Sequence, residues 1–125
     1  MKQNASPAEE LEGFLNFVDT CIGAYKIAYD AVNEEDRRLQ DLVHAIEFAP
    51  DKSERNRAAT RMQQSRRLRR KNKDIVQMNE RLVKFFEDQN NRATLNRMRQ
   101  LLGQQRKEED FLKGKRVYKP RVEGK

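Results

Sequence analysis

The stretch that decides the fold runs from Arg55 to Lys73 and reads RNRAATRMQQSRRLRRKNK, with nine basic side chains and no carboxylate among its nineteen residues. Neither Gly nor Pro interrupts it, and its Ala, Met, Gln and Leu residues favour helix. An apolar segment follows, from Ile75 to Phe86. When the sequence is projected as a helix, Leu68 and most of these apolar residues fall on one side, and the main cations fall on the other. We therefore predict a long amphipathic helix that turns a cationic flank outward.

A second long helix is predicted before this stretch. Ser6-Pro7-Ala8-Glu9 has the composition of a capped helix start. Phe17 and Ile27 widen the apolar arc of its first half, which therefore needs two neighbours, whereas the second half has a narrow stripe and needs one. A second register, at Phe14/Leu15, Cys21/Ile22, Ala28/Tyr29 and Leu42/Val43, supports the main apolar stripe and is interrupted only at Glu35-Asp36. The main stripe repeats every seven residues, at Leu11, Val18, Tyr25, Val32, Leu39 and Ile46.

Two turn signals, around Pro50 and at Gln89-Asn90-Asn91, divide the chain into three helices. Gly114 is placed to end the last one. The predicted fold is all-α, an elongated three-helix bundle in which two long antiparallel helices form a projecting hairpin and a shorter third helix packs beside them. We expect a single domain at 1–114, with helices at 7–48, 52–88 and 92–113, and a basic extended tail at 115–125.

The expected core lies where all three helices meet. Its predicted members are Phe14, Phe17, Ile22, Tyr25, Ile75, Leu82, Phe86, Leu95 and Leu101.

Size and composition restrict the class of protein. The chain has 125 residues, of which 36% are hydrophobic and 38% charged, so a slender helical bundle is expected and a wide core is not. No run approaches the roughly 20 apolar residues of a membrane span, and the N-terminus has no apolar signal segment. Cys21 is the only cysteine, which excludes an internal disulfide. We therefore expect a cytoplasmic protein that does not bind membranes.

The net charge of +7 is unevenly distributed. Residues 1–50 carry four basic and ten acidic side chains, a balance of −6, whereas residues 51–125 carry twenty-three and ten, a balance of +13. The acidic third is therefore too small to neutralise the basic remainder, and the excess favours an external polyanion.

The strongest candidate site is a cationic row on the second helix. Arg66, Arg70 and Lys73 stack at helical spacing, with Arg67 and Lys71 beside them, over about 10 Å. Guanidinium groups bind phosphate through a bidentate fork, so this row suits a nucleic-acid backbone. In the tail, Arg116, Lys119 and Arg121 accompany Tyr118, which could stack on a base.

Other interpretations of these cations stay open. The row is also consistent with a solvated face, or with a site for an acidic protein surface, and the tail with an ordinary chain terminus. A solvated row would be balanced across the hairpin by the carboxylates of Glu34, Glu35, Asp36, Asp41 and Glu47.

The sequence offers no catalytic grouping. His44 is the only histidine and lies off the apolar register, and Cys21 lies on an apolar stripe, so neither a zinc site nor a Cys–His pair can form. There is no phosphate-binding loop. We predict a protein that is not an enzyme and has no cofactor or metal.

Four segments carry a resemblance to a known group of proteins. They are Arg66–Lys73, the apolar run to Phe86, Leu101–Glu108 (LLGQQRKE) and Tyr118–Arg121. Over most of residues 25–122 the chain resembles small all-helical accessory proteins encoded by prophages and phages of Gram-positive bacteria. The resemblance implies a role in phage–host interaction in the host cytoplasm. Proteins of this group act as replication accessories, transcription regulators or inhibitors of host defence such as anti-CRISPR proteins. It transfers no functional residue.

The function that we expect is non-enzymatic binding of nucleic acid, or of a ribonucleoprotein, through the basic helical face. One alternative is a coiled-coil homo-oligomer, such as a homodimer, that acts as a structural or protein-interaction module. Another is a sponge for anionic nucleotides.

Overall fold

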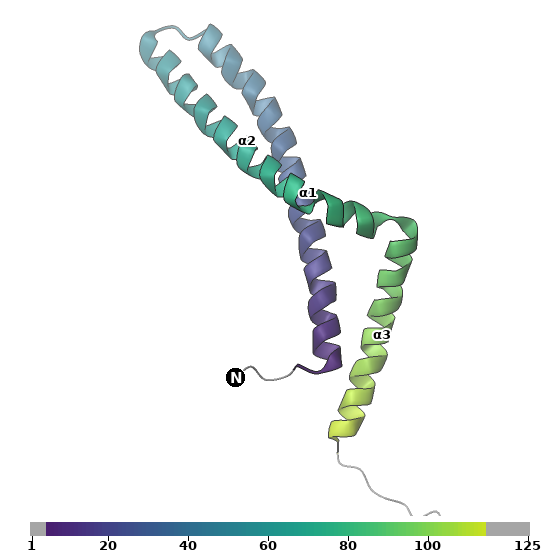
Figure 1. Ribbon diagram of the computed structural model, residues 1–125. Coiled ribbons are helices and arrows are strands. Elements are labelled where there is room, and N and C mark those ends of the chain that lie inside the picture. The colour runs from purple at the N-terminus through teal and green to yellow at the C-terminus, as the bar shows by residue number, and fades with distance from the viewer. Residues whose placement is uncertain (1–4, 115–125) are drawn as a thin grey trace, which may run out of the picture.

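The computed structural model describes residues 5–114, which form three consecutive α-helices and no strand (Figure 1). Helix α1 spans Pro7–Glu47, α2 spans Lys52–Glu87 and α3 spans Gln89–Lys113. The predicted all-α class with three helices is confirmed. Helix α3 begins three residues before its predicted start, because Asp88 ends α2 and also caps α3 by accepting from the Asn90 N–H (3.2 Å).

The helix ends follow from local chemistry. Ser6 and Glu9 form a reciprocal capping box, in which the Glu9 N–H donates to Ser6 Oγ (3.2 Å) and the Ser6 N–H donates to Glu9 Oε1 (3.0 Å). Asp51 caps α2 by accepting from the Glu54 N–H (2.8 Å). The short turn that contains Pro50 therefore separates two helices that each have a defined end.

Helices α1 and α2 pack closely along a narrow seam. In Figure 1 the second half of α1 and the first half of α2 lie side by side, away from α3. We call this part, residues 30–47 and 52–73, the two-helix arm. The opposite part, where the start of α1 and the end of α2 meet α3, is called the three-helix end.

The seam uses the second of the two predicted registers more than the main stripe. On α1, buried positions recur every seven residues at Cys21, Ala28, Glu35 and Leu42. Of the main predicted stripe, Val18 is fully buried and the other members are half-buried. On α2, Ala58 and Ser65 are buried at the same spacing. The small side chains among these residues, Cys21, Ala28, Ala58 and Ser65, let the two helix axes approach each other.

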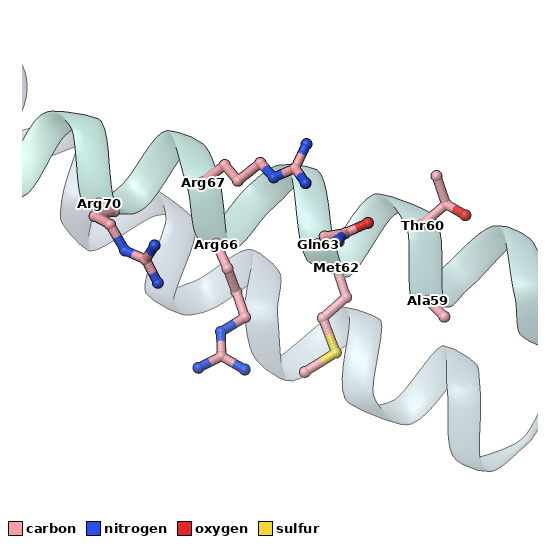
Figure 2. A pocket seen from close by; sticks show the side chains of 7 residues that line it. All are labelled: Ala59, Thr60, Met62, Gln63, Arg66, Arg67 and Arg70. Carbon is pink, nitrogen blue, oxygen red and sulfur yellow. The ribbon is translucent and has the colours of Figure 1, made fainter.

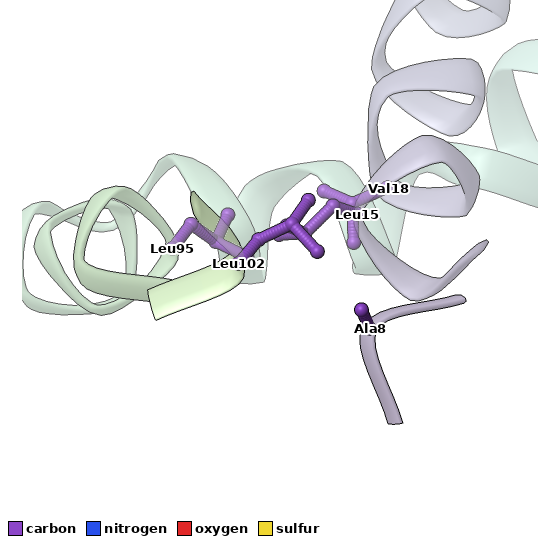
Figure 3. Packing of buried hydrophobic residues seen from close by; sticks show 5 residues of the cluster. All are labelled: Ala8, Leu15, Val18, Leu95 and Leu102. Carbon is purple, nitrogen blue, oxygen red and sulfur yellow. The ribbon is translucent and has the colours of Figure 1, made fainter. Parts of the chain in front are cut away.

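The core of the three-helix end is small and aliphatic. Figure 3 shows its five buried residues, Ala8, Leu15, Val18, Leu95 and Leu102, and four half-buried residues pack against them, Leu11, Ile22, Phe86 and Met98.

The predicted core was only partly right. Leu95 is buried, and Ile22, Tyr25, Ile75 and Phe86 are half-buried. Phe14, Phe17, Leu82 and Leu101 are exposed, which contradicts the prediction. On α3 the correction has a simple cause. Successive helical residues point about 100° apart, and it is Leu102, not Leu101, that faces α1.

Polar contacts join α3 to the start of α1. Arg99 Nη2 lies 3.1 Å from Asp19 Oδ1, Arg106 forms an ion pair with Glu12, and the Ala8 N–H donates to Glu109 Oε2 (2.8 Å). Among the described residues, no helix combines the length and apolarity needed to cross a membrane.

Candidate nucleic-acid interface

The predicted cationic row lies on the outer surface of α2 in the two-helix arm. Arg66, Arg67, Arg70, Lys71 and Lys73 are all exposed. Within residues 5–114, none of them forms an ion pair with a carboxylate. The condition that the row faces solvent is therefore met. Its assignment as a binding site stays a prediction.

Two arginines of the same stretch behave differently. Arg69 is half-buried, and its Nε lies 2.5 Å from Asp36 Oδ1 on α1. Arg57 pairs with Glu54 of its own helix (3.2 Å). The stretch Arg55–Lys73 thus contains structural cations as well as unpaired ones, a distinction that the sequence alone did not reveal.

The acidic segment of α1 does little to neutralise the row. Glu34 and Glu35 are both engaged by Arg38 of their own helix, at 3.2 and 2.6 Å. Asp41 and Glu47 form no ion pair within the part of the chain that the structure describes. The Arg69–Asp36 contact is the single ion pair between α1 and the stretch Arg55–Lys73 among residues 5–114. The predicted balance across the two helices is therefore mostly absent.

A buried polar contact joins α1 and α2 in the seam beside the row. Ser65 Oγ donates to Glu35 at the centre of the seam, and both residues are more than nine-tenths buried. The sequence placed Glu35 among the carboxylates that could balance the row across the hairpin. In the structure Ser65 and Arg38 are instead the partners of Glu35. Its seven-residue spacing from Ala28 and Leu42 was the signal that could have placed it in the seam.

Around the row, the surface of the arm is hollowed on the flank of α2. One open hollow of about 630 Å³ is lined by Arg66, Arg67 and Arg70 together with Ala59, Thr60, Met62 and Gln63. In Figure 2, Met62, Arg66 and Arg70 extend toward the side where α1 passes, whereas Arg67 and Thr60 point to the other side. The cationic row therefore has two sides, of which one borders the seam.

A second hollow, of about 380 Å³, lies at the seam itself. It is lined by Asp36, Leu39, Arg66, Arg69, Arg70 and Lys73, so it shares Arg66 and Arg70 with the first. Four cations face one carboxylate there, and that carboxylate is already paired with Arg69. The arrangement is suited to holding an anion.

The other residues considered from the sequence are the tail cations, His44 and Cys21, and of these neither His44 nor Cys21 lines the two hollows. The tail residues Arg116, Lys119 and Arg121 lie outside the described residues. His44 is exposed and stacks on Phe48, with 6.1 Å between ring centroids, and Cys21 is buried. Among the described residues, no three His, Cys, Asp or Glu side chains are grouped in a way that could hold a metal ion.

Comparison with known proteins gave no match: no family model matches the sequence, and neither a curated protein nor a solved structure does. The site must therefore be interpreted from the residues of this chain.

Proposed function

We propose that this chain is a non-enzymatic binding protein that holds nucleic acid, or a nucleoprotein complex, on the cationic face of α2. The observation that supports this proposal most is the presence of five exposed cations within residues 66–73, with no carboxylate partner among residues 5–114. Stability alone is a weak reason for such a density of like charge, because exposed ion pairs contribute only ~0–1 kcal/mol and these cations form none.

The architecture that we infer makes this face accessible. In this proposal α1 and α2 run antiparallel as a hairpin that projects beyond α3, so that a long ligand can approach the arm without meeting the third helix. Arg66, Arg70 and Lys73 then present a row about 10 Å long, enough to follow a few phosphates. Contacts of this kind position a nucleic acid but do not select its sequence.

Charge reversal tests the proposal. The variant Arg66→Glu/Arg70→Glu/Lys73→Glu should lose binding to a fluorescently labelled oligonucleotide in anisotropy measurements, while its circular dichroism stays helical. The matched control, Arg92→Glu/Arg97→Glu/Lys107→Glu, changes the net charge by the same amount at exposed positions scattered over α3. It should retain most of the binding. Equal loss in both variants would show that only total charge matters and would refute a defined face.

A homo-oligomeric coiled coil is a second candidate, and a specific observation favours it. Large apolar side chains are exposed on α1 and α2, with exposed fractions of 51% for Phe17, 72% for Ile27, 77% for Met78 and 58% for Phe85. Light scattering at micromolar concentration tests this candidate. A homo-oligomer should give a multiple of the chain mass of 14.8 kDa, and a mass near 14.8 kDa itself would count against the coiled-coil oligomer.

Inhibition of a host defence complex, the role implied by the resemblance to phage accessory proteins, would be one use of such a face. Affinity capture from a bacterial lysate, with and without nuclease, tests this part. Retention of a ribonucleoprotein only in the untreated lysate would support binding through its nucleic acid.

A further inference from the structure

Two hollows of the two-helix arm meet at the same pair of side chains. Arg66 and Arg70 line both the open hollow on the flank of α2 and the hollow at the α1–α2 seam. We call the continuous surface that they form the seam groove, and it contains Met62, Arg66, Arg70 and Lys73 of α2 and Leu39 of α1.

The seam groove is strongly cationic and already contains its own counter-charge. Asp36 lies there, but its carboxylate is held 2.5 Å from Arg69 Nε. Arg66, Arg70 and Lys73 have no such partner within the described residues. The groove therefore has an excess positive charge that is complementary to successive phosphates of one strand.

The same groove also has an apolar component. Met62 and Leu39 are half-buried, so that part of each side chain stays accessible beside the arginines. Figure 2 shows Met62 on the same side of α2 as Arg66 and Arg70. In a duplex the faces of the bases are stacked on one another, so they could not use such a surface, whereas the unpaired bases of a single strand could lie against it or against a guanidinium plane.

We propose that the seam groove binds single-stranded nucleic acid, with phosphates on Arg66, Arg70 and Lys73 and unpaired bases against Met62 and Leu39. This inference rests on the proposed function and narrows it from nucleic acid in general to a single strand on the seam side of α2. Arg67 and Lys71 contribute long-range attraction from the other side of the row. Asp36 opposes the phosphates while it orients Arg69.

The test compares a labelled thymidine oligonucleotide of about 20 nucleotides with a duplex of the same length, using anisotropy with the full chain. The single strand should bind roughly tenfold more tightly than the duplex, because only its bases reach the groove. Met62→Gln keeps side-chain length and helix propensity and should weaken single-strand binding about threefold or more while duplex binding is unchanged. The matched control Met78→Gln changes an exposed methionine away from the groove and should have no effect.

The charges of the groove give an independent measurement. Arg66→Gln/Arg70→Gln should weaken single-strand binding more than Arg67→Gln/Lys71→Gln, although each pair removes two charges. Asp36→Asn should strengthen it, because the opposing charge is removed. Tight duplex binding with no effect of Met62→Gln would overturn the seam groove and leave the proposed function intact. Absence of salt-sensitive binding to either nucleic acid would overturn both.

Discussion

The three-helix end and the two-helix arm share helix α1, yet the carboxylates of α1 have different partners in the two regions. Near its start, Asp19 and Glu12 form ion pairs with Arg99 and Arg106 of α3. In the arm, Glu34 and Glu35 form ion pairs with Arg38 on their own helix. Among residues 5–114, Asp36 is the one carboxylate of the arm that forms an ion pair with α2, and Glu35 also accepts a hydrogen bond from Ser65.

This difference explains why the cations of α2 stay available. At the three-helix end, arginines that face α1 meet carboxylates, beside a buried core of Leu15, Val18, Leu95 and Leu102. In the arm, the buried seam contains Glu35, Leu42, Ala58 and Ser65. Two carboxylates of α1 there pair with Arg38 of their own helix, and Asp36 alone forms an ion pair with α2 among residues 5–114. One region therefore uses charge to attach a helix, whereas the other leaves a dense cluster of positive charge facing outward.

The largest expected effect concerns the three-helix end. Leu102→Ala should lower the free energy of unfolding by about 2–5 kcal/mol, because it removes a buried side chain and leaves a cavity. Leu101→Ala is the matched control at an exposed position and should cost well under half as much. Urea denaturation followed by circular dichroism measures both. Equal costs would contradict the register of α3, and a folded Leu102→Ala variant that no longer binds nucleic acid would contradict the separation of the two regions.

A smaller effect is expected at the seam of the arm. Ser65→Ala removes the hydroxyl that donates to the buried carboxylate of Glu35, which should destabilise the protein by about 1–3 kcal/mol. Thr60→Ala, at an exposed position on the same helix, should change stability by less than about 0.5 kcal/mol. If Glu35→Leu is then added to Ser65→Ala, most of the loss should be recovered, because a buried polar pair can be replaced by apolar packing. A Ser65→Ala variant as stable as the wild type would show that the contact does not hold the register.

The smallest expected effect is a dependence of stability on acid at the three-helix end. Hydrogen bonds from the Ser6 hydroxyl, the Gln105 side chain and the Ala8 N–H lower the pKa of Glu109, and the Ser6 backbone and side chain lower the pKa of Glu9. Because both pKa values are lower in the folded than in the unfolded chain, this stabilisation is complete above the unfolded value. The stabilisation is lost as the pH falls through the lower pKa values that the two carboxyl groups have in the folded chain.

Urea titrations at pH 7 and pH 3 measure this effect. The Glu109→Gln variant should lose less stability on acidification than the wild type, since it has one fewer carboxylate to protonate. Glu108→Gln, at an exposed neighbouring position, should lose as much as the wild type. The acid dependence of the two variants should therefore differ, and identical curves would show that Glu109 does not contribute.

Much of the secondary structure was predictable from the sequence, because caps and turns are local. Ser6-Pro7 and the turn at Pro50 mark ends that the structure also has. The packing was harder to predict, because it depends on which of two neighbouring apolar positions faces the partner. Leu101 and Leu102 are chemically identical. A stripe of Cys21, Ala28 and Leu42 looks weaker than one of Tyr25, Val32 and Leu39, although it is the more deeply buried of the two.

The candidate site was predictable to the same degree. The density of basic residues located the row on α2, and helical spacing placed Arg66, Arg70 and Lys73 together. Nothing in the sequence separated Arg69 from Arg70, because only the register of the seam decides which of them meets Asp36. The hollow beside Leu39 likewise depends on how α1 and α2 pack against each other.

The central claim is that α2 presents cations to an external polyanion from the arm and not from the whole surface. The most direct measurement is the salt dependence of the association constant for single-stranded DNA. The logarithm of that constant should fall linearly with the logarithm of salt concentration, and the slope should shrink by about 2 in Arg66→Gln/Arg70→Gln/Lys73→Gln. It should stay unchanged in Arg92→Gln/Arg97→Gln/Lys107→Gln. Equal slopes for the wild type and both variants would contradict the account.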